Sequence, residues 1–176
     1  QWRDTDGDGY GDNSIGTNPD ACPTVAGNST EGGMLGCADG DGDGWADAND
    51  ALPSDPTQNL DTDGDSYGDN AMGTDPDACP NTAGNSTIDR LGCVDTDGDG
   101  VSDLNDAFPS DATRTTDSDM DGFDDAEDDC PNTFGNSVNG SLGRFDADQD
   151  SWADANDSFP SDSTQWNDTD GDGFGD

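Results

Sequence analysis

Aspartates recur at fixed intervals in seven short loops. Counted from its first aspartate, each loop has Asp at positions 1, 3, 5 and 9, and an aromatic residue or valine at position 7. Alternate carboxylates on a tight turn reach one point, and the carbonyl of position 7 adds another oxygen. Calcium requires six to eight oxygens at about 2.3–2.6 Å. The spacing therefore predicts calcium loops, with at least six calcium ions as cofactors.

Three loops fit the twelve-residue calcium pattern, which ends on a ligand at position 12. Their predicted ligands are Asp39, Asp41, Asp43, Trp45, Asp47 and Asp50; Asp95, Asp97, Asp99, Val101, Asp103 and Asp106; and Asp146, Asp148, Asp150, Trp152, Asp154 and Asp157. Gly44 and Gly100 at position 6 permit the sharp bend. Ser151 replaces this glycine in the third loop, which predicts a strained turn there.

Three other loops alternate with these along the chain. Their predicted ligands are Asp4, Asp6, Asp8, Tyr10, Asp12 and Asp20; Asp61, Asp63, Asp65, Tyr67, Asp69 and Asp77; and Asp117, Asp119, Asp121, Phe123, Asp125 and Asp128. Asp128 stands at position 12 and completes the twelve-residue pattern, whereas a five-residue insertion precedes Asp20 and Asp77, which we still expect to close their loops by a longer path. A seventh loop comprises Asp168, Asp170, Asp172, Phe174 and Asp176.

The loops belong to a longer sequence repeat. The leading aspartate stands at 4, 61, 117 and 168, which defines repeat 1 (1–57), repeat 2 (58–113), repeat 3 (114–164) and the start of a fourth (165–176). Each full repeat holds a first and a second loop, and each of these loops ends on Asp, any residue, a bulky apolar residue or Cys, then Pro. Cys and Leu or Phe alternate at one place in this closure, which predicts a single buried slot. Repeats of this kind predict an array rather than one domain.

Regular secondary structure is expected to be minor. No segment has apolar residues at the spacing of an amphipathic helix, and strict alternation never extends beyond a few residues. The predicted fold is mostly irregular: an elongated tandem array of calcium loops, stabilised by metal ions and disulfides. Because no helix-length segment flanks the loops, an EF-hand pair and a dockerin-like module are both disfavoured.

Composition excludes several classes of function. The chain has 43 acidic residues against four basic ones, for a net charge of -39, and only 27% of residues are apolar. This excludes a nucleic-acid partner and a conventional core, so that either the chain is disordered or a cation folds it. No apolar run is long enough for membrane insertion. Without histidine, lysine or a paired nucleophile and base, the chain is not expected to be an enzyme.

Four of the five cysteines form two pairs of nearly equal spacing. We predict local disulfides between Cys22 and Cys37 and between Cys79 and Cys93, each worth about 3 kcal/mol in the chain-entropy model. Disulfides indicate an oxidising compartment, hence an extracellular or cell-surface location. In repeat 3 Arg144 occupies the second cysteine place, which leaves Cys130 either as a buried thiol or in an intermolecular bridge.

Sequons give the candidates for glycosylation. Asn28, Asn85 and Asn139 each begin an Asn-x-Ser/Thr sequence, one per repeat, in the segment between the cysteine positions. Chance occurrence in a chain rich in Asn, Ser and Thr is the competing explanation.

These motifs together resemble thrombospondin type 3 repeats and the related acidic repeats of large microbial surface proteins. The matching features are DxDxDGxxDxxDxCP, as in Asp117 to Pro131, and the linker 53–58 that leads into Asp61. The resemblance covers the whole chain, and implies calcium ions bound along an extended, disulfide-linked chain that acts outside the cell. Leu52, Phe108 and Phe159 stand where the family often has Cys, and 24–36, 81–92 and 132–143 are longer than usual, so the family's disulfide pairing is not carried over.

Two functions follow as hypotheses. The first is a calcium-dependent structural segment, a stalk, spacer or fibre-forming element, with calcium as partner and self-association into a fibre. The second is a calcium-dependent adhesion module that presents aromatic residues to a glycan or protein partner.

Overall fold

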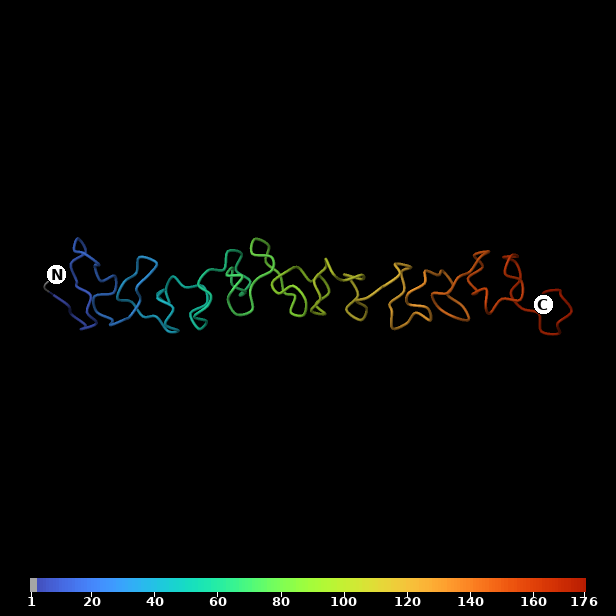
Figure 1. Cartoon of the computed structure of the whole chain (residues 1–176), viewed down its shortest axis with the longest axis horizontal. Helices are drawn as coiled ribbons and strands as arrows, with labels where there is room; N and C mark the ends of the chain where they lie inside the picture. Colours follow the sequence, from blue (N-terminus) through green and yellow to red (C-terminus); the bar gives the residue numbers. More distant parts are fainter. Residues whose placement is uncertain (1–2) are drawn as a thin grey trace. The chain divides into compact units, whose positions relative to one another are not determined.

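The chain has almost no regular secondary structure. The computed structural model describes residues 3–176, and over this range it contains no helix and no strand (Figure 1). Only three isolated parallel bridges occur among these residues, Gly11–Pro19, Gly68–Pro76 and Asn139–Trp152. The irregular fold predicted from the sequence is confirmed. None of the described residues belongs to a helix long and apolar enough to cross a membrane.

Contacts between residues divide the chain into two units. The first is Gln1–Asn105 and the second is Asp106–Asp176. The first unit contains the first loops of repeats 1 and 2, the second loop of repeat 1 and positions 1 to 11 of the second loop of repeat 2. The second unit contains both loops of repeat 3 and the seventh loop.

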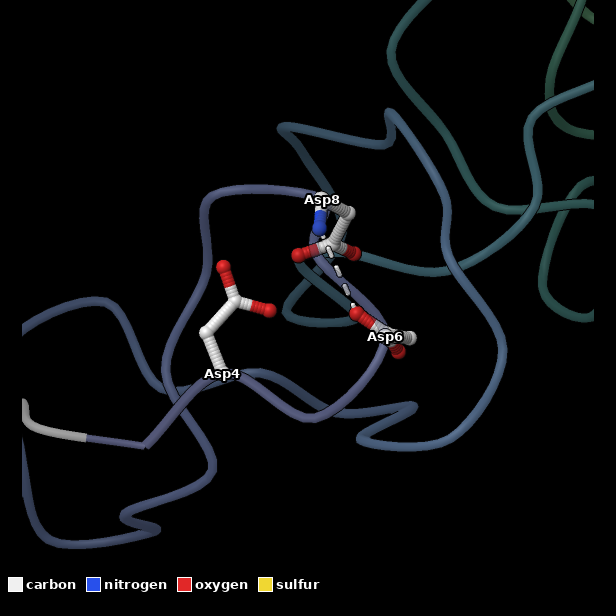
Figure 2. A group of neighbouring side chains, drawn as sticks. All are labelled: Asp4, Asp6 and Asp8. Carbon is white, nitrogen blue, oxygen red and sulfur yellow. Dashed lines mark hydrogen bonds between the residues drawn. The ribbon is translucent and has the colours of Figure 1, made fainter.

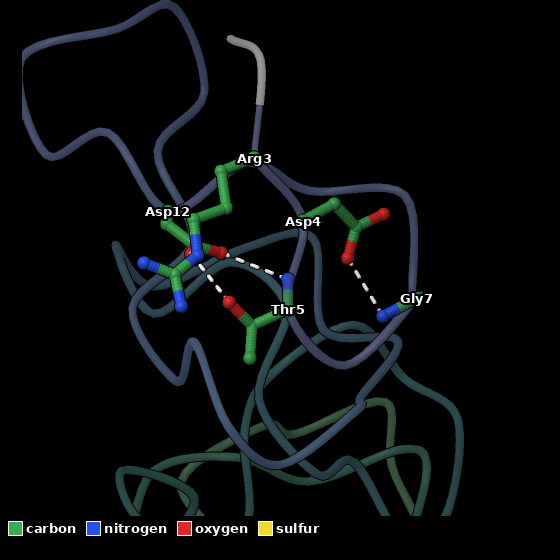
Figure 3. A network of polar contacts seen from close by, with 5 residues as sticks. All are labelled: Arg3, Asp4, Thr5, Gly7 and Asp12. Atoms are coloured by element: carbon green, nitrogen blue, oxygen red, sulfur yellow. Dashed lines mark hydrogen bonds and ion pairs between the residues drawn. The ribbon is translucent and has the colours of Figure 1, made fainter.

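The first aspartate of each loop organises the turn around its own carboxylate. In Asp4, one oxygen accepts a hydrogen bond from the amide of Gly7 at 2.7 Å (Figure 3). The other oxygen accepts one from the amide of Gly9 at 3.1 Å. The same two bonds, from the amides of positions 4 and 6, recur in the other six loops, at Asp39, Asp61, Asp95, Asp117, Asp146 and Asp168. Position 1 therefore nucleates the loop through local side chain to backbone bonds.

The aspartate at position 9 fastens the base of the loop. Asp12 accepts hydrogen bonds from the amide of Thr5 at 3.0 Å and from its hydroxyl at 2.5 Å (Figure 3). The Asp12 amide donates to the carbonyl of Arg3 at 2.8 Å. The Arg3 guanidinium lies 3.2 Å from the same carboxylate. In every other loop the position-9 carboxylate also accepts from the amide of position 2, at Asp47, Asp69, Asp103, Asp125, Asp154 and Asp176.

Two positions of every loop lie in the left-handed backbone region. Position 6 has a φ of 97° at Gly9 and 102° at Gly44, but serine holds it at Ser66 and Ser151, each with a φ of 81°. Position 4 is equally left-handed, with positive φ even where it is Met120 or Gln149. The strained turn predicted at Ser151 is therefore present. A non-glycine residue in this region costs about 1–2 kcal/mol.

The closing aspartate keeps one place whether or not an insertion precedes it. Without an insertion, the amide of Asp50 donates to the carbonyl of Ala46, at position 8, over 3.0 Å. With the insertion, the amide of Asp20 still donates to the position-8 carbonyl, that of Gly11, also at 3.0 Å. The amides of Asp77 and Asp128 donate to the position-8 carbonyls of their own loops, each at 2.9 Å. The extra five residues are looped out, as expected from the sequence.

The interior of the described chain is polar. Its buried apolar residues are only Cys37, Ala46, Cys93 and Ala153. The buried polar residues are thirteen, namely Asp20, Ser29, Asp50, Gln58, Asp77, Ser86, Asp95, Ser102, Asp106, Asp124, Asp128, Ser137 and Asp146. Hydrogen bonds and carboxylates thus occupy the place of a hydrophobic core.

The expectation of a single buried slot before each closing proline was wrong. The six residues at this place are all half-buried: Cys22, Leu52, Cys79, Phe108, Cys130 and Phe159. Since only four apolar residues are buried among those described, no apolar core encloses the slot. Phe108 is covered instead by the Arg114 guanidinium, which lies 3.8 Å from the centre of its ring.

A short link segment joins the two loops of each repeat, covering 27–36, 84–92 and 135–143. In repeat 1 it lies within the Cys22–Cys37 disulfide, and in repeat 2 within Cys79–Cys93, so both predicted disulfides are present. Its centre is a serine with no exposed surface, Ser29, whose hydroxyl donates to the carbonyl of Met34 and accepts from the amide of Cys37. Ser86 and Ser137 make the equivalent bonds in repeats 2 and 3.

Replacing Ser151 with glycine should stabilise the second loop of repeat 3. Removing the side chain relieves about 1–2 kcal/mol of backbone strain, and the φ of 81° is retained without cost. We expect a higher thermal unfolding midpoint in saturating calcium. Gly9→Ser is the mirror control, since a Cβ there meets no atom within 4 Å and adds strain alone. An equal midpoint for Ser151→Gly and the parent would contradict the strain.

Arg144→Cys should create a third disulfide with Cys130, which is a free thiol. The amide of Arg144 donates to the buried Ser137 hydroxyl at 3.0 Å, as the amide of Cys37 does to Ser29 in repeat 1. The backbone of repeat 3 is therefore already in the disulfide-bonded arrangement, and closing a loop of about 15 residues adds about 3 kcal/mol. Intact mass without reductant should fall by two hydrogens. A variant that keeps two free thiols would show that the backbones differ.

Candidate metal centres

The carboxylates of positions 1, 3 and 5 come together in the aspartate loops. Figure 2 shows the first loop, where the side chains of Asp4, Asp6 and Asp8 turn towards a common space. One oxygen from each lies within 4.8 Å of the others. The same convergence occurs at Asp39, Asp41 and Asp43; Asp61, Asp63 and Asp65; Asp95, Asp97 and Asp99; Asp117, Asp119 and Asp121; and in two more groups. These parts of the predicted sites are thus brought together.

Many of the converging oxygens are buried without a hydrogen-bond donor. Among the described residues, thirteen carboxylate oxygens are shielded from solvent and unpartnered. All of them belong to position 3, position 5 or the closing position, namely Asp6, Asp20, Asp41, Asp63, Asp77, Asp97, Asp99, Asp119, Asp148, Asp150 and Asp157. In Asp63 and Asp119 both oxygens are orphaned. Buried charges require a partner or a metal, so these donors fit a hard cation.

The closing aspartate joins the converging group in the first loops. Asp20 is 5% exposed, with one oxygen accepting from the amide of Cys22 at 2.7 Å and the other orphaned. Gly36 packs between this carboxylate and that of Asp8: a Cβ on Gly36 would lie 2.6 Å from an oxygen of Asp20 and 3.0 Å from one of Asp8. Gly92 is placed in the same way between Asp77 and Asp65. A residue from beyond the insertion therefore reaches the ligand group.

The loops concentrate negative charge at a cost. Burial raises the pKa of Asp77 above its usual value, and the neighbouring Asp65, Asp63 and Asp69 carboxylates raise it further, against a backbone hydrogen bond from Cys79. Burial likewise raises the pKa of position 3 or the closing residue in other loops, at Asp6, Asp50, Asp119 and Asp148. These carboxylates hold their protons more tightly because their charges are close together and poorly solvated.

The position-9 aspartates have a different role in the structure. A hydrogen bond from the Thr5 hydroxyl lowers the pKa of Asp12, so this carboxylate is already stabilised in its ionised form. The ligand role of this position, and of the position-7 carbonyl, stays a prediction. The side chains at position 7 are half-buried, except Phe174, which is 77% exposed.

The buried glutamine that positions the insertion was missed by the sequence analysis. Gln58 is 1% exposed; its side-chain amide donates to the carbonyls of Asn70 and Thr74 at 3.1 and 3.0 Å and accepts from the Asn70 amide at 2.9 Å. Gln165 occupies the same phase and accepts from the amide of Gly175 at 2.7 Å. The signal was present, since these glutamines begin their repeats, but a polar residue at a repeat start does not by itself indicate burial.

Asp89 is a second residue without a predicted role. It lies in the link segment of repeat 2 and accepts hydrogen bonds from the amide and hydroxyl of Ser102 at 2.9 and 2.8 Å and from Asn105 at 2.6 Å. Burial works against its ionisation, yet these bonds and one from the Arg90 amide hold the pKa of Asp89 well below its usual value. It fastens the link segment to the second loop.

The three sequon asparagines lie on the surface. Asn28, Asn85 and Asn139 are all exposed. The following residue, Ser29 or Ser86, is fully buried in the first two cases. Their glycosylation stays a prediction.

No protein-family model matches the chain, and no curated protein sequence matches it. A function for the chain is therefore inferred from the geometry of its loops.

Asp63→Asn should weaken metal binding in the first loop of repeat 2. Both oxygens of Asp63 are buried and unpartnered, and the amide removes one of them and the charge. Since losing even an outer-shell partner of a metal costs about 10–100-fold in affinity, we expect at least about a 10-fold rise in the calcium concentration that orders this loop, measured from its amide NMR signals.

Asp75→Asn is the matched control for Asp63→Asn. It removes one negative charge from the same loop. Repeat 1 has Asn18 at the place of Asp75, and Asn18 and Asp75 both have positive φ, so asparagine fits this backbone. Calcium affinity should change little. Equal effects of the two substitutions would show that net charge, rather than ligand geometry, governs binding.

Proposed function

We propose that this chain is a calcium-dependent structural segment of an extracellular protein, acting as a stalk, spacer or fibre-forming element. The observation that carries the proposal is the set of orphaned carboxylate oxygens, buried in repeated acidic loops of a chain that has only four buried apolar residues among those described. The likeness to thrombospondin type 3 repeats agrees with it.

Cations would supply the stability that the polar interior lacks. Two carboxylates about 5 Å apart repel by roughly 0.8 kcal/mol even in bulk water, and each loop has several. At a calcium concentration about ten times the dissociation constant, each site contributes roughly 1.4 kcal/mol by mass action. Six such sites give about 8 kcal/mol, which lies within the usual stability of a folded domain.

Positions 1, 3 and 5 and the closing aspartate would hold each ion. A bound calcium ion supplies positive charge and accepts oxygen ligands without a strict geometry. The carboxylates of Asp6 and Asp20, which are fourteen residues apart in sequence, would then be held together instead of repelling each other.

An extracellular setting is favoured by the two disulfides. Calcium-stabilised repeats that follow one another without a gap suit a spacer, and association of copies would extend it into a fibre. Catalysis is not proposed, because the chain has no histidine or lysine.

An adhesion module is the second candidate. Trp166 is 48% exposed and stacks on Trp152, with ring centres 6.1 Å apart and planes at 4°. A shallow pocket beside it is lined by Thr164, Gln165, Asn167 and Asp176 as well. An aromatic face next to a few polar groups is a usual feature of small-ligand sites, and a glycan is the ligand we propose for it.

Removing calcium should unfold the chain. In calcium, the loop amides that donate to position 1, such as Gly9 and Gly44, should exchange slowly with solvent, and addition of a chelator should abolish this protection. Hydrogen exchange measured by mass spectrometry reports it. Magnesium at the same concentration is the control, since it has the same charge but demands near-octahedral geometry and dehydrates reluctantly.

Unchanged exchange after chelation would refute the calcium dependence. Electron microscopy of the native material then distinguishes the two candidate roles: continuous fibres of this chain support the structural role, whereas isolated particles attached to a glycan or protein partner support adhesion.

A further inference from the structure

Each link segment contacts the ligand groups of the first loop at both of its ends. At the start, the amide of Gly27 donates to the position-5 carboxylate of Asp8 at 3.1 Å. At the other end, Gly36 lies against Asp8 and the closing Asp20, with no room for a side chain. The contact at the start of the segment is also present in the other two repeats. The amide of Gly84 donates to the Asp65 carboxylate at 2.9 Å, and that of Gly135 donates to the Asp121 carboxylate at 3.0 Å.

The middle of the same segment holds the second loop. The amides of Thr30 and Glu31 both donate to the carbonyl of Gly44 at 2.8 Å. Gly44 is position 6 of the second loop, and its own amide donates to the position-1 carboxylate of Asp39 at 3.0 Å. The equivalent pairs of amides are Thr87 and Ile88 to Gly100, and Val138 and Asn139 to Ser151.

The link segment is held in one conformation from within. The buried Ser29 hydroxyl bridges the backbone of Met34 and Cys37, and the amides of Asn28 and Ser29 both donate to the Cys37 carbonyl. Gly27 lies so close to that carbonyl that a Cβ would come within 2.0 Å of it. A segment tied in this way transmits a displacement at one end to the other instead of absorbing it.

We propose that each link segment couples the two ion sites of its repeat, so that calcium in one loop raises the calcium affinity of the other, with the buried serine as the positioning residue. This rests on the proposed calcium binding. A calcium ion that fixes Asp8 and Asp20 also fixes both ends of the link segment, which contact these carboxylates. The middle of the segment then holds Gly44, whose amide donates to Asp39. By linkage the effect is reciprocal.

The coupling can be measured by disabling one loop and following the other. Asp41 has a buried, unpartnered oxygen, so Asp41→Asn disables the second loop of repeat 1. In a calcium titration of the full chain, the amide NMR signal of Gly9 reports the first loop and that of Gly44 the second. We expect Asp41→Asn to raise the calcium midpoint at Gly9 by at least about 5-fold, the lower end of typical coupling between sites.

The link segment itself is tested by a double-mutant cycle. In a Ser29→Ala background, Asp41→Asn should shift the Gly9 midpoint by less than about 2-fold, because the two loops are no longer coupled. Ser54→Ala, at an exposed serine of the same repeat, is the matched control and should leave the full shift. Asp55→Asn removes one charge outside the loops and controls for electrostatics alone. The signals of Gly122 and Ser151 in repeat 3 should not move.

Each other result decides against some part of the proposal. If Gly9 titrates alike with and without Asp41→Asn, the two loops are independent and the coupling is overturned. If Ser29→Ala leaves the shift intact, the serine is not the positioning residue. If Ser29→Ala does not fold in saturating calcium, Glu31→Pro, which removes one of the two amides that donate to Gly44, is judged by the same criterion.

The proposed function and the coupling fail in different ways. Loops that show no calcium-dependent signal at all would overturn the proposed function and the coupling with it. Loops that respond to calcium independently would overturn the coupling alone.

Discussion

The constraint on which the structure depends is the confinement of carboxylates away from water. Positions 1, 3 and 5 bring carboxylate oxygens to within 4.8 Å of one another in the groups described, and among the described residues thirteen carboxylate oxygens of position 3, position 5 and the closing position are buried without a donor. In an ordinary domain such oxygens would be strongly destabilising. Here they lie in a chain with only four buried apolar residues among those described. Cations bound to these oxygens are therefore the proposed source of its stability.

Hydrogen bonding divides the aspartates into two groups with different duties. Those at positions 1 and 9 are used by the backbone: Asp4 accepts from the amides of Gly7 and Gly9, and Asp12 from Thr5. Buried carboxylate oxygens without a donor are found instead at position 3 of six loops, at position 5 in Asp99 and Asp150, and at the closing Asp20, Asp77 and Asp157. Positions 1 and 9 shape the loop, and in the proposed function position 1 also joins the carboxylates with unpartnered oxygens in holding the ion, so that one residue type would provide both the scaffold and the site.

Rigid peptide contacts replace side-chain packing between the loops. The buried serines, the close approach of Gly27 to Cys37 and the paired amides on Gly44 are all backbone-centred. Such contacts are local in sequence, which is why the chain can repeat the arrangement with a variable insertion and without the disulfide in repeat 3, where Arg144 keeps the backbone bonds of Cys37. The disulfide adds stability to an arrangement that the hydrogen bonds already define.

The sequence alone determined the irregular fold, the aspartate phases, both disulfides and the return of Asp20 and Asp77 to the closing place, because each of these follows from spacing between near neighbours. The tertiary structure decided which carboxylates remain free, that the slot before each closing proline is only half-buried, and that Gln58, Asp89 and the serines of the link segments are structural centres. These depend on which donors reach which oxygens in space. An aspartate that accepts backbone hydrogen bonds and one whose buried oxygens have no donor look the same in a sequence, and only the geometry of their neighbours separates them.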